Sequence, residues 1–173
     1  MGVCASAVES KGDHNAIGKT KTAILVRETR NPLAILTEIF AQAVPVAPHT
    51  RIIYSGPVTL DEKTASHVET VILPIVDSIT QSLGLPSKEF SISIANVGAA
   101  AAKGAGLRIT GFSADIPFLM AMLSASLQAE LRQNIMATGH IASLAGEVVP
   151  VLGIPAKIEA AIAYGHVDEF LFP

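Results

Sequence analysis

The feature that most constrains the fold is the apolar segment 116–131, which predicts a helix with very little polar surface. Leu119 and Leu123 follow a helical spacing on one side, and Phe118 and Met122 continue the apolar surface on the other. A helix that is apolar nearly all round is buried within a protein. The chain must therefore build a core around this helix, and its hydrophobic content of 50% is sufficient for one.

The loop 110–115 leads into this helix and places Ser113 beside its N-terminus. A serine in that position is most often an N-cap, whose hydroxyl accepts a free backbone N–H. Pro117 favours another arrangement, because proline has no N–H and fits only the first turn of a helix. The cap then falls within 114–116, where Asp115 suits it best. We therefore expect Ser113 to lie just outside the helix with a free hydroxyl.

Composition narrows the classes of protein that the chain can belong to. Its 173 residues fit one domain, 1–173, with a net charge of −3 and no basic cluster, so we expect no nucleic-acid or membrane partner. The single Cys4 can form no internal disulfide. The sequence shows no signal peptide and no apolar run long enough to cross a bilayer, so we expect a cytoplasmic protein.

Strand and helix patterns are interspersed along the chain and predict an α+β fold with mixed β-sheets. A helix that Pro74 either kinks or breaks is expected over 62–83. Segment 31–43 fits either a short helix or a strand, and the glycine-rich segment 96–106 fits either a mobile loop over a cleft or a plain connector. Strands are expected at 2–9, 19–28, 50–55, 90–94, 107–110, 135–141, 147–151 and 169–172, the first two as a hairpin.

Lys157 lies in a position that is poor for a cation. Pro155 marks the first turn of a helix that ends at Tyr164, with Gly165 as its stop. The positive end of the helix dipole disfavours the charged amine there, and burial would lower its pKa further. An ordinary solvated lysine is the common alternative. Together, Ser113 and Lys157 are the two parts of a Ser-Lys dyad, in which a neutral lysine takes the serine proton.

The second half of the chain resembles the proteolytic domain of Lon proteases. The resemblance extends from Phe90 to Pro173 and is weaker before it. It rests on four segments in the family's order and with nearly its spacing: Gly111-Phe112-Ser113-Ala114, Thr138-Gly139-His140-Ile141, the segment 146–153 that begins Gly146-Glu147-Val148-Val149-Pro150, and Ile154-Pro155-Ala156-Lys157. The resemblance implies a Lon proteolytic-domain-like α+β fold, with a buried helix following the nucleophile.

The resemblance also implies a role for each residue of the site. Ser113 would be the nucleophile of a serine endopeptidase acting on unfolded or flexible polypeptides, and Lys157 its general base and acid. Thr138 would hold the lysine amine in place. The backbone N–H groups of Ser113, Ala114 and Asp115, at a helix N-terminus, would stabilise the oxyanion. No cofactor in this chain is needed for this chemistry.

The surroundings of the dyad differ from the family pattern at Thr110, Phe112, Asp115 and His140. We expect Thr110, Asp115 and His140 to support the site, although His140 also fits a plain strand residue with a satisfied ring. The five histidines show no H-E-x-x-H or similar ligand spacing, so no metal site is predicted.

Partners follow from the resemblance as well. Lon proteolytic domains form six-membered rings and work with an ATPase, which would be a separate domain or subunit here. The family's domain continues past the final strand, whereas this chain ends at Pro173, so we expect a fragment or a shortened relative. The alternative function is a catalytically inactive Lon-fold module, which acts as an oligomerisation or binding platform in a larger ATPase assembly. Retention of both Ser113 and Lys157 favours the peptidase.

Overall fold

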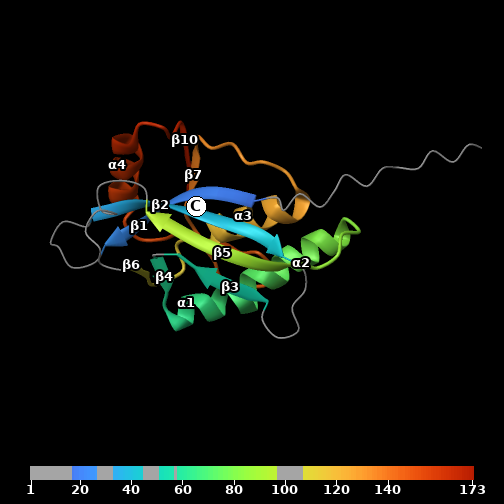
Figure 1. Ribbon diagram of the computed structural model, residues 1–173. Coiled ribbons are helices and arrows are strands. Elements are labelled where there is room, and N and C mark those ends of the chain that lie inside the picture. Colours follow the sequence, from blue (N-terminus) through green and yellow to red (C-terminus); the bar gives the residue numbers. More distant parts are fainter. Residues whose placement is uncertain (1–16, 27–32, 45–50, 57, 97–106) are drawn as a thin grey trace, which may run out of the picture.

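The computed structural model describes residues 17–26, 33–44, 51–56, 58–96 and 107–173, which form a mixed α+β fold (Figure 1). The elements in chain order are β1 (Ile17–Val26), β2 (Leu33–Val44), β3 (Ile52–Ser55), β4 (Val58–Leu60), α1 (Glu62–His67), the π-helical turn η1 (Val68–Ile72), α2 (Leu73–Ser82), β5 (Glu89–Asn96), β6 (Leu107–Ile109), α3 (Asp115–Leu127), β7 (Ile135–Ala137), β8 (His140–Ile141), β9 (Val148–Val149), α4 (Ile154–Tyr164) and β10 (Glu169–Leu171). Among the described residues, no helix combines the length and apolar character needed to cross a membrane.

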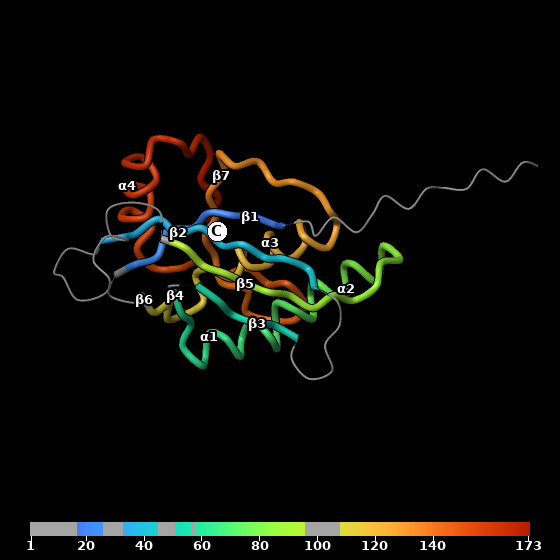
Figure 2. Tube along the Cα trace, in the orientation of Figure 1, coloured from blue at the N-terminus to red at the C-terminus, as the bar shows by residue number. Residues whose placement is uncertain are grey.

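A six-stranded mixed sheet forms the centre, with the strand order β10-β7-β1-β2-β5-β3. β1 pairs antiparallel with β2 and parallel with β7, so the second half of the chain returns to the side of the first strand (Figure 2). Successive strand residues point to opposite faces of a sheet. Accordingly, Ile24 and Ile39 belong to one buried cluster, and Ala23 and Leu36 belong to another.

The two clusters lie on the two faces of the sheet and are covered by different helices. The larger one contains Phe118 and Met122 of α3, together with residues of η1 and α2. The smaller one contains Ala156 and Ala161 of α4, which lies on the opposite side of β1 and β2 from α1 and α2 (Figure 1). The expected burial of the helix after Ser113 is therefore confirmed, because Phe118 and Met122 are fully buried.

Most of the expected strands are confirmed within the described residues. The ambiguous segment 31–43 is a strand, β2, and it is the hairpin partner of β1. The expected strand 135–141 is divided into β7 and β8, and 147–151 is reduced to the two residues of β9. The expected strand 2–9 and all but the first residue of the expected loop 96–106 lie outside the described residues.

The kink or break expected at Pro74 takes the form of the π-helical turn η1, which joins α1 to α2 without interrupting the helical path. Pro74 has no N–H to donate to the carbonyl four residues earlier, so the regular ladder cannot pass through it. The N–H of Leu73 instead reaches back five residues to the carbonyl of Val68. The helix thus changes its winding just before the proline and continues as α2.

The limits of the buried helix differ from those expected. α3 begins at Asp115 and ends at Leu127, because Gln128 adopts a left-handed conformation with φ of 51°. The N-cap is Ala114, which provides no side-chain cap. The prediction that Asp115 caps the helix is therefore wrong, since its carboxylate is engaged by other partners.

Gly18 of β1 allows α3 to pack directly on the sheet. A Cβ atom at this position would lie 1.8 Å from the backbone oxygen of Ala121. We expect Gly18→Ala to lower the free energy of unfolding by about 1–3 kcal/mol, because a backbone clash cannot be relieved by a side-chain rotation. Urea unfolding measures this change. The neighbouring, exposed Ile17→Ala should change stability by less than about 0.5 kcal/mol, and equal effects of the two variants would contradict the packing argument.

Candidate functional site

Ser113 lies on the short turn between β6 and α3, at the edge of a cleft. Gly111 precedes it with φ of 82°, a left-handed conformation that glycine adopts without strain. The side chain of Ser113 is half-buried, and the helix receives no side-chain cap, in agreement with the expected free hydroxyl. The cleft has a volume of about 480 Å³ and is lined by Ile24, Leu25, Thr110, Gly111, Phe112, Ser113, His140, Pro150, Val151 and Leu152.

The carbonyl of Ser113 joins this turn to the segment between β7 and β8. It accepts hydrogen bonds from the Thr138 hydroxyl at 2.8 Å and from the Gly139 N–H at 3.0 Å. Ala114 and Gly139 also form an isolated parallel bridge. Three segments that are separate in the sequence meet here, because Thr138 in turn contacts α4.

Lys157 reaches this junction from the first turn of α4. The helix begins after Gly153, and the N–H of Lys157 closes its first turn on the Gly153 carbonyl at 3.1 Å. The lysine side chain is fully buried, and its Nζ donates to Thr138 Oγ1 at 2.7 Å. Ser113, Thr138 and Lys157 are therefore connected through one chain of hydrogen bonds, which runs from the amine to the threonine hydroxyl and on to the serine carbonyl.

Burial lowers the pKa of Lys157 to about 8. Within the described part of the chain, no carboxylate forms an ion pair with this lysine. Lys21 is also buried, but its Nζ lies 3.8 Å from the carboxylate of Glu38 and donates to the carbonyl of Gln133. A buried lysine without a counter-ion is uncommon, and a pKa near neutrality is what a general base requires.

Of the three backbone N–H groups expected to stabilise an oxyanion, two remain candidates in the structure. The N–H of Asp115 donates to the Phe112 carbonyl at 3.2 Å, so it is already engaged. Within the described residues, the N–H groups of Ser113 and Ala114 make no backbone hydrogen bond. These two groups lie at the N-terminus of α3, where the helix dipole favours negative charge, and they are the better candidates.

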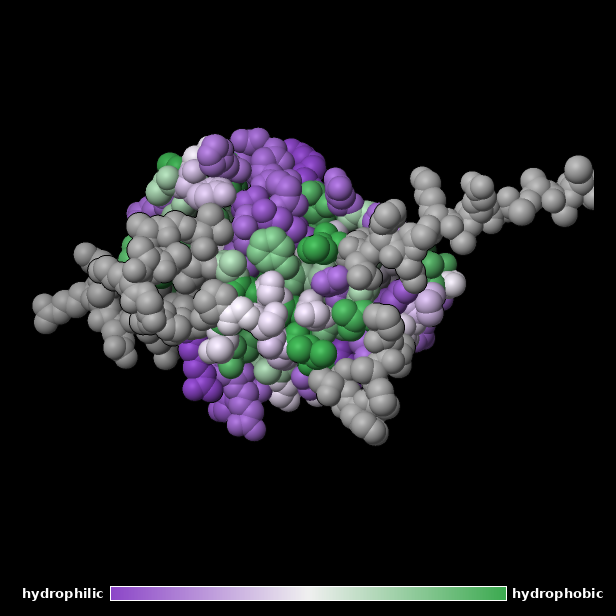
Figure 3. Space-filling view, in the orientation of Figure 1, coloured by the Kyte–Doolittle hydropathy of each residue, from purple (hydrophilic) through white to green (hydrophobic). Residues whose placement is uncertain are grey.

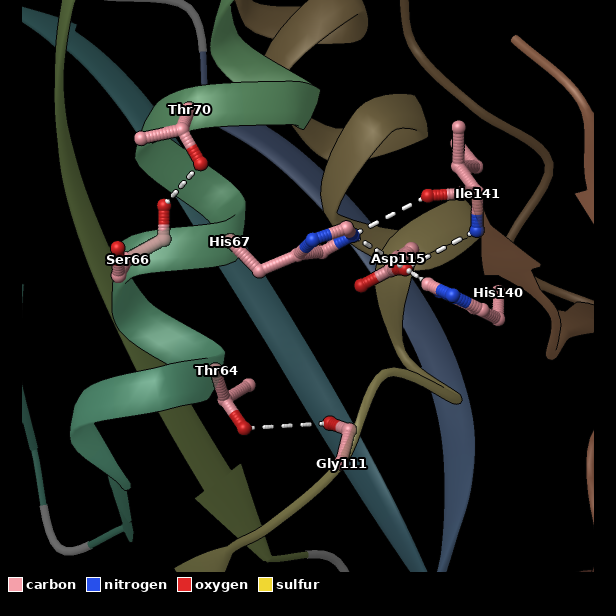
Figure 4. Close-up of polar contacts among 8 residues, drawn as sticks. All are labelled: Thr64, Ser66, His67, Thr70, Gly111, Asp115, His140 and Ile141. Atoms are coloured by element: carbon pink, nitrogen blue, oxygen red, sulfur yellow. Dashed lines mark hydrogen bonds and ion pairs between the residues drawn. The ribbon is translucent and has the colours of Figure 1, made fainter. Parts of the chain in front are cut away.

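Thr110 and His140 both line the cleft, and Asp115 is not among its lining residues. The Asp115 carboxylate is fully buried, and its Oδ2 accepts from His140 Nδ1 at 2.7 Å and from the Ile141 N–H at 3.0 Å (Figure 4). Burial raises the pKa of Asp115, and these hydrogen bonds oppose the rise. His140 is thus directed at Asp115, and no described hydrogen bond connects its side chain to Ser113 or Lys157.

His67 is a member of the site that the sequence did not predict. Its Nε2 lies 3.0 Å from Asp115 Oδ2 and 3.2 Å from the Ile141 carbonyl. The Phe112 ring packs against the rings of both His67 and His140, with centroid distances of 4.4 and 4.9 Å. His67 ends a helix in the first half of the chain, and only the tertiary fold brings it to Asp115, so no spacing rule indicates it.

Comparison with known proteins identifies no relative: no protein-family model matches the chain, and no curated protein does.

The depressed pKa of Lys157 predicts a pH-dependent stability. The pKa of Lys157 is about 8 in the folded state and near 10.5 in the unfolded state, so between these two pH values only the unfolded state holds the proton. The free energy of unfolding therefore rises as the pH increases from about 8 to about 10.5. At pH 7 the buried, charged amine lowers the free energy of unfolding by about 3 kcal/mol. Lys157→Met removes this penalty but also loses the hydrogen bond to Thr138, worth about 1 kcal/mol. We expect Lys157→Met to be more stable than the parent by about 2 kcal/mol at pH 7 and to lose this advantage by about pH 10.

Urea unfolding of both proteins at several pH values measures this difference and cancels the titration of other groups. Lys63→Met, which removes an exposed lysine, serves as the control and should show no pH-dependent difference from the parent. Parallel pH profiles for Lys157→Met and the parent would contradict the depressed pKa.

Proposed function

We propose that this chain is a serine peptidase with a Ser-Lys dyad, which hydrolyses peptide bonds of unfolded or flexible polypeptides as Lon proteolytic domains do. The observation that carries the proposal is the buried Lys157, which has no described ion pair and is bound to the Ser113 segment through Thr138. Placing an unpaired amine in the core costs stability. A catalytic base near neutral pH is a chemical reason to retain it.

The proposed reaction uses only side-chain and backbone groups. The neutral Lys157 amine takes the Ser113 hydroxyl proton as Oγ attacks the peptide carbonyl, which gives a tetrahedral oxyanion and a lysine ammonium. The N–H groups of Ser113 and Ala114 stabilise this oxyanion. The ammonium then donates its proton to the leaving amine, and an acyl-serine ester forms. Water, deprotonated by Lys157, hydrolyses that ester and restores the serine.

Thr138 orients the base in this proposal. Its hydroxyl proton is directed to the Ser113 carbonyl, so its oxygen can only accept from Lys157. One amine hydrogen is thereby fixed on Thr138, which limits the rotation of the amine. The proposed reaction requires that its lone pair then reach the Ser113 hydroxyl. Thr138 acts through the lysine and is therefore a positioning residue.

The cleft supports an apolar side chain next to the scissile bond. Leu25, Phe112, Val151 and Leu152 line it beside Ser113. Leu152 is 82% exposed, so an apolar substrate residue would cover surface that water now contacts. We therefore propose that the enzyme prefers substrates with apolar residues beside the cleaved bond.

Self-association fits both the peptidase and the non-catalytic platform. The face in Figure 3 carries apolar side chains among weakly polar ones across the centre of the sheet, over β2, β5 and β3. Ile53 on β3 is 49% exposed and lies on the face of the sheet opposite to the buried Ile52. A second copy of the chain would cover such side chains, in a ring of six by resemblance to Lon, with an ATPase as a separate domain or subunit.

Ser113→Ala tests the nucleophile. We expect the variant to lose hydrolysis of fluorescently labelled casein and labelling by a fluorophosphonate, while its unfolding curve stays close to the parent's, because only one hydroxyl is removed. Ser143→Ala, on the turn between β8 and β9, is the matched control and should cleave at the parent rate. If Ser113→Ala retains parental activity, Ser113 is not the nucleophile, and the platform function becomes the better proposal.

The pH dependence of acylation tests the base. A lysine with a pKa of about 8 is mostly charged at pH 7, so the acylation rate should rise roughly 30-fold from pH 6.5 to a plateau above about pH 9. Lys157→Met and Lys157→Arg should abolish acylation at every pH, since thioether and guanidinium groups accept no proton there. Lys21→Met, which removes another buried lysine, should keep the parental profile. Retention of that profile in Lys157→Met would rule out the dyad.

A further inference from the structure

Three potential metal ligands converge beside the cleft from three different elements. His67 ends α1, Asp115 begins α3 and His140 begins β8, and the two rings point toward the carboxylate (Figure 4). One ligand atom from each residue lies within 4.8 Å of the other two. The nitrogens concerned are His67 Nε2 and His140 Nδ1, at 3.0 and 2.7 Å from Asp115 Oδ2.

The two oxygens of the Asp115 carboxylate differ in their hydrogen bonding. Oδ2 accepts from His67, His140 and the Ile141 N–H, whereas Oδ1 is buried and accepts no hydrogen bond from a described residue. A buried carboxylate oxygen without a partner is destabilising, and the side chain is only 1% exposed. A cation bound at Oδ2 would offset the negative charge of this buried carboxylate.

We propose that His67, Asp115 and His140 bind one Zn²⁺ ion. Two imidazole nitrogens and one carboxylate oxygen match the preference of zinc for nitrogen and oxygen ligands. Tetrahedral bonds of about 2.0–2.1 Å place ligand atoms about 3.3 Å apart, so each imidazole nitrogen has to move about half an ångström away from Asp115 Oδ2. The two nitrogens, which lie within 4.8 Å of each other, have to take up the same spacing. The fourth ligand would be water.

The residues around His67, Asp115 and His140 favour the binding of a zinc ion. Phe112 packs against both imidazole rings and restrains their orientation. The His67 and His140 side chains are 13% and 24% exposed, and each borders a hollow, so an ion and a water ligand can enter from solvent. In a neutral ring, the nitrogen that faces Asp115 gains a free lone pair when the ring proton moves to the other nitrogen. A ring that is protonated on both nitrogens would release one proton when zinc binds.

This site is separate from the proposed peptidase chemistry. Neither the Ser113 hydroxyl nor Lys157 is among its ligands, and the proposal does not depend on hydrolysis. Bound zinc would connect α1, α3 and β8, and would therefore stabilise the wall of the cleft that carries Phe112 and His140.

The experiment titrates the full chain, first stripped of metal with EDTA, with Zn²⁺ alone in competition with a chromophoric chelator. We expect one ion per chain, and at free zinc 100-fold above Kd a rise in Tm of about 5–10 °C. Co²⁺ should give the visible absorption of a tetrahedral site, and Mg²⁺, which prefers six oxygen ligands, should not compete.

Variants assign the ligands. His67→Gln and His140→Gln retain an amide donor toward Asp115 and should each weaken zinc binding roughly tenfold or more, since one ligand nitrogen is lost. The exposed His166→Ala is the matched control, and Ser113→Ala should bind zinc as the parent does even if it is inactive. Absence of saturable binding by the folded parent, or equal binding by a His67→Gln, His140→Gln double variant, would overturn the zinc site and leave a hydrogen-bonded cluster.

Discussion

The site depends on the hydrogen bonds that the Ser113 carbonyl accepts from Thr138 and Gly139. They join the turn before α3 to the segment between β7 and β8, which are far apart in the sequence. They also fix the direction of the Thr138 hydroxyl, and with it the position of the Lys157 amine. Without this junction, the serine and the lysine would be joined only through the sheet that α3 and α4 cover from its two faces.

The burial of Lys157 favours its proposed function as a base but lowers the stability of the folded chain. The burial that lowers its pKa is a free-energy penalty on the folded state whenever the amine is charged. The surrounding fold must provide that energy, and the apolar clusters on both faces of the sheet are its main source. Lys21 shows how a structural buried lysine is stabilised, since a carboxylate and a backbone carbonyl accompany it.

Local patterns predicted local structure well. The apolar surface around Phe118, the alternation in β5 and the Pro155 and Gly165 signals around α4 depend on neighbours in the sequence, and the structure agrees with each. The hydrogen-bond partners of the Asp115 side chain could not be predicted from such local patterns. Its side chain was expected to cap α3, but two imidazoles and the Ile141 N–H engage it through contacts between distant segments. His67 was missed for the same reason, because local spacing carries no information about such contacts.

Asp115 also imposes an electrostatic condition on the proposed reaction. It lies two residues after Ser113 at the N-terminus of α3, where an anion is stabilised by the helix dipole but would repel a developing oxyanion nearby. The donors from His67, His140 and Ile141 reduce the negative charge that faces the cleft, and a cation on the same carboxylate would reduce it further. In the proposed reaction, the hydrogen bonds to Asp115 would therefore limit its repulsion of the oxyanion, although none of the groups that make them touches the substrate.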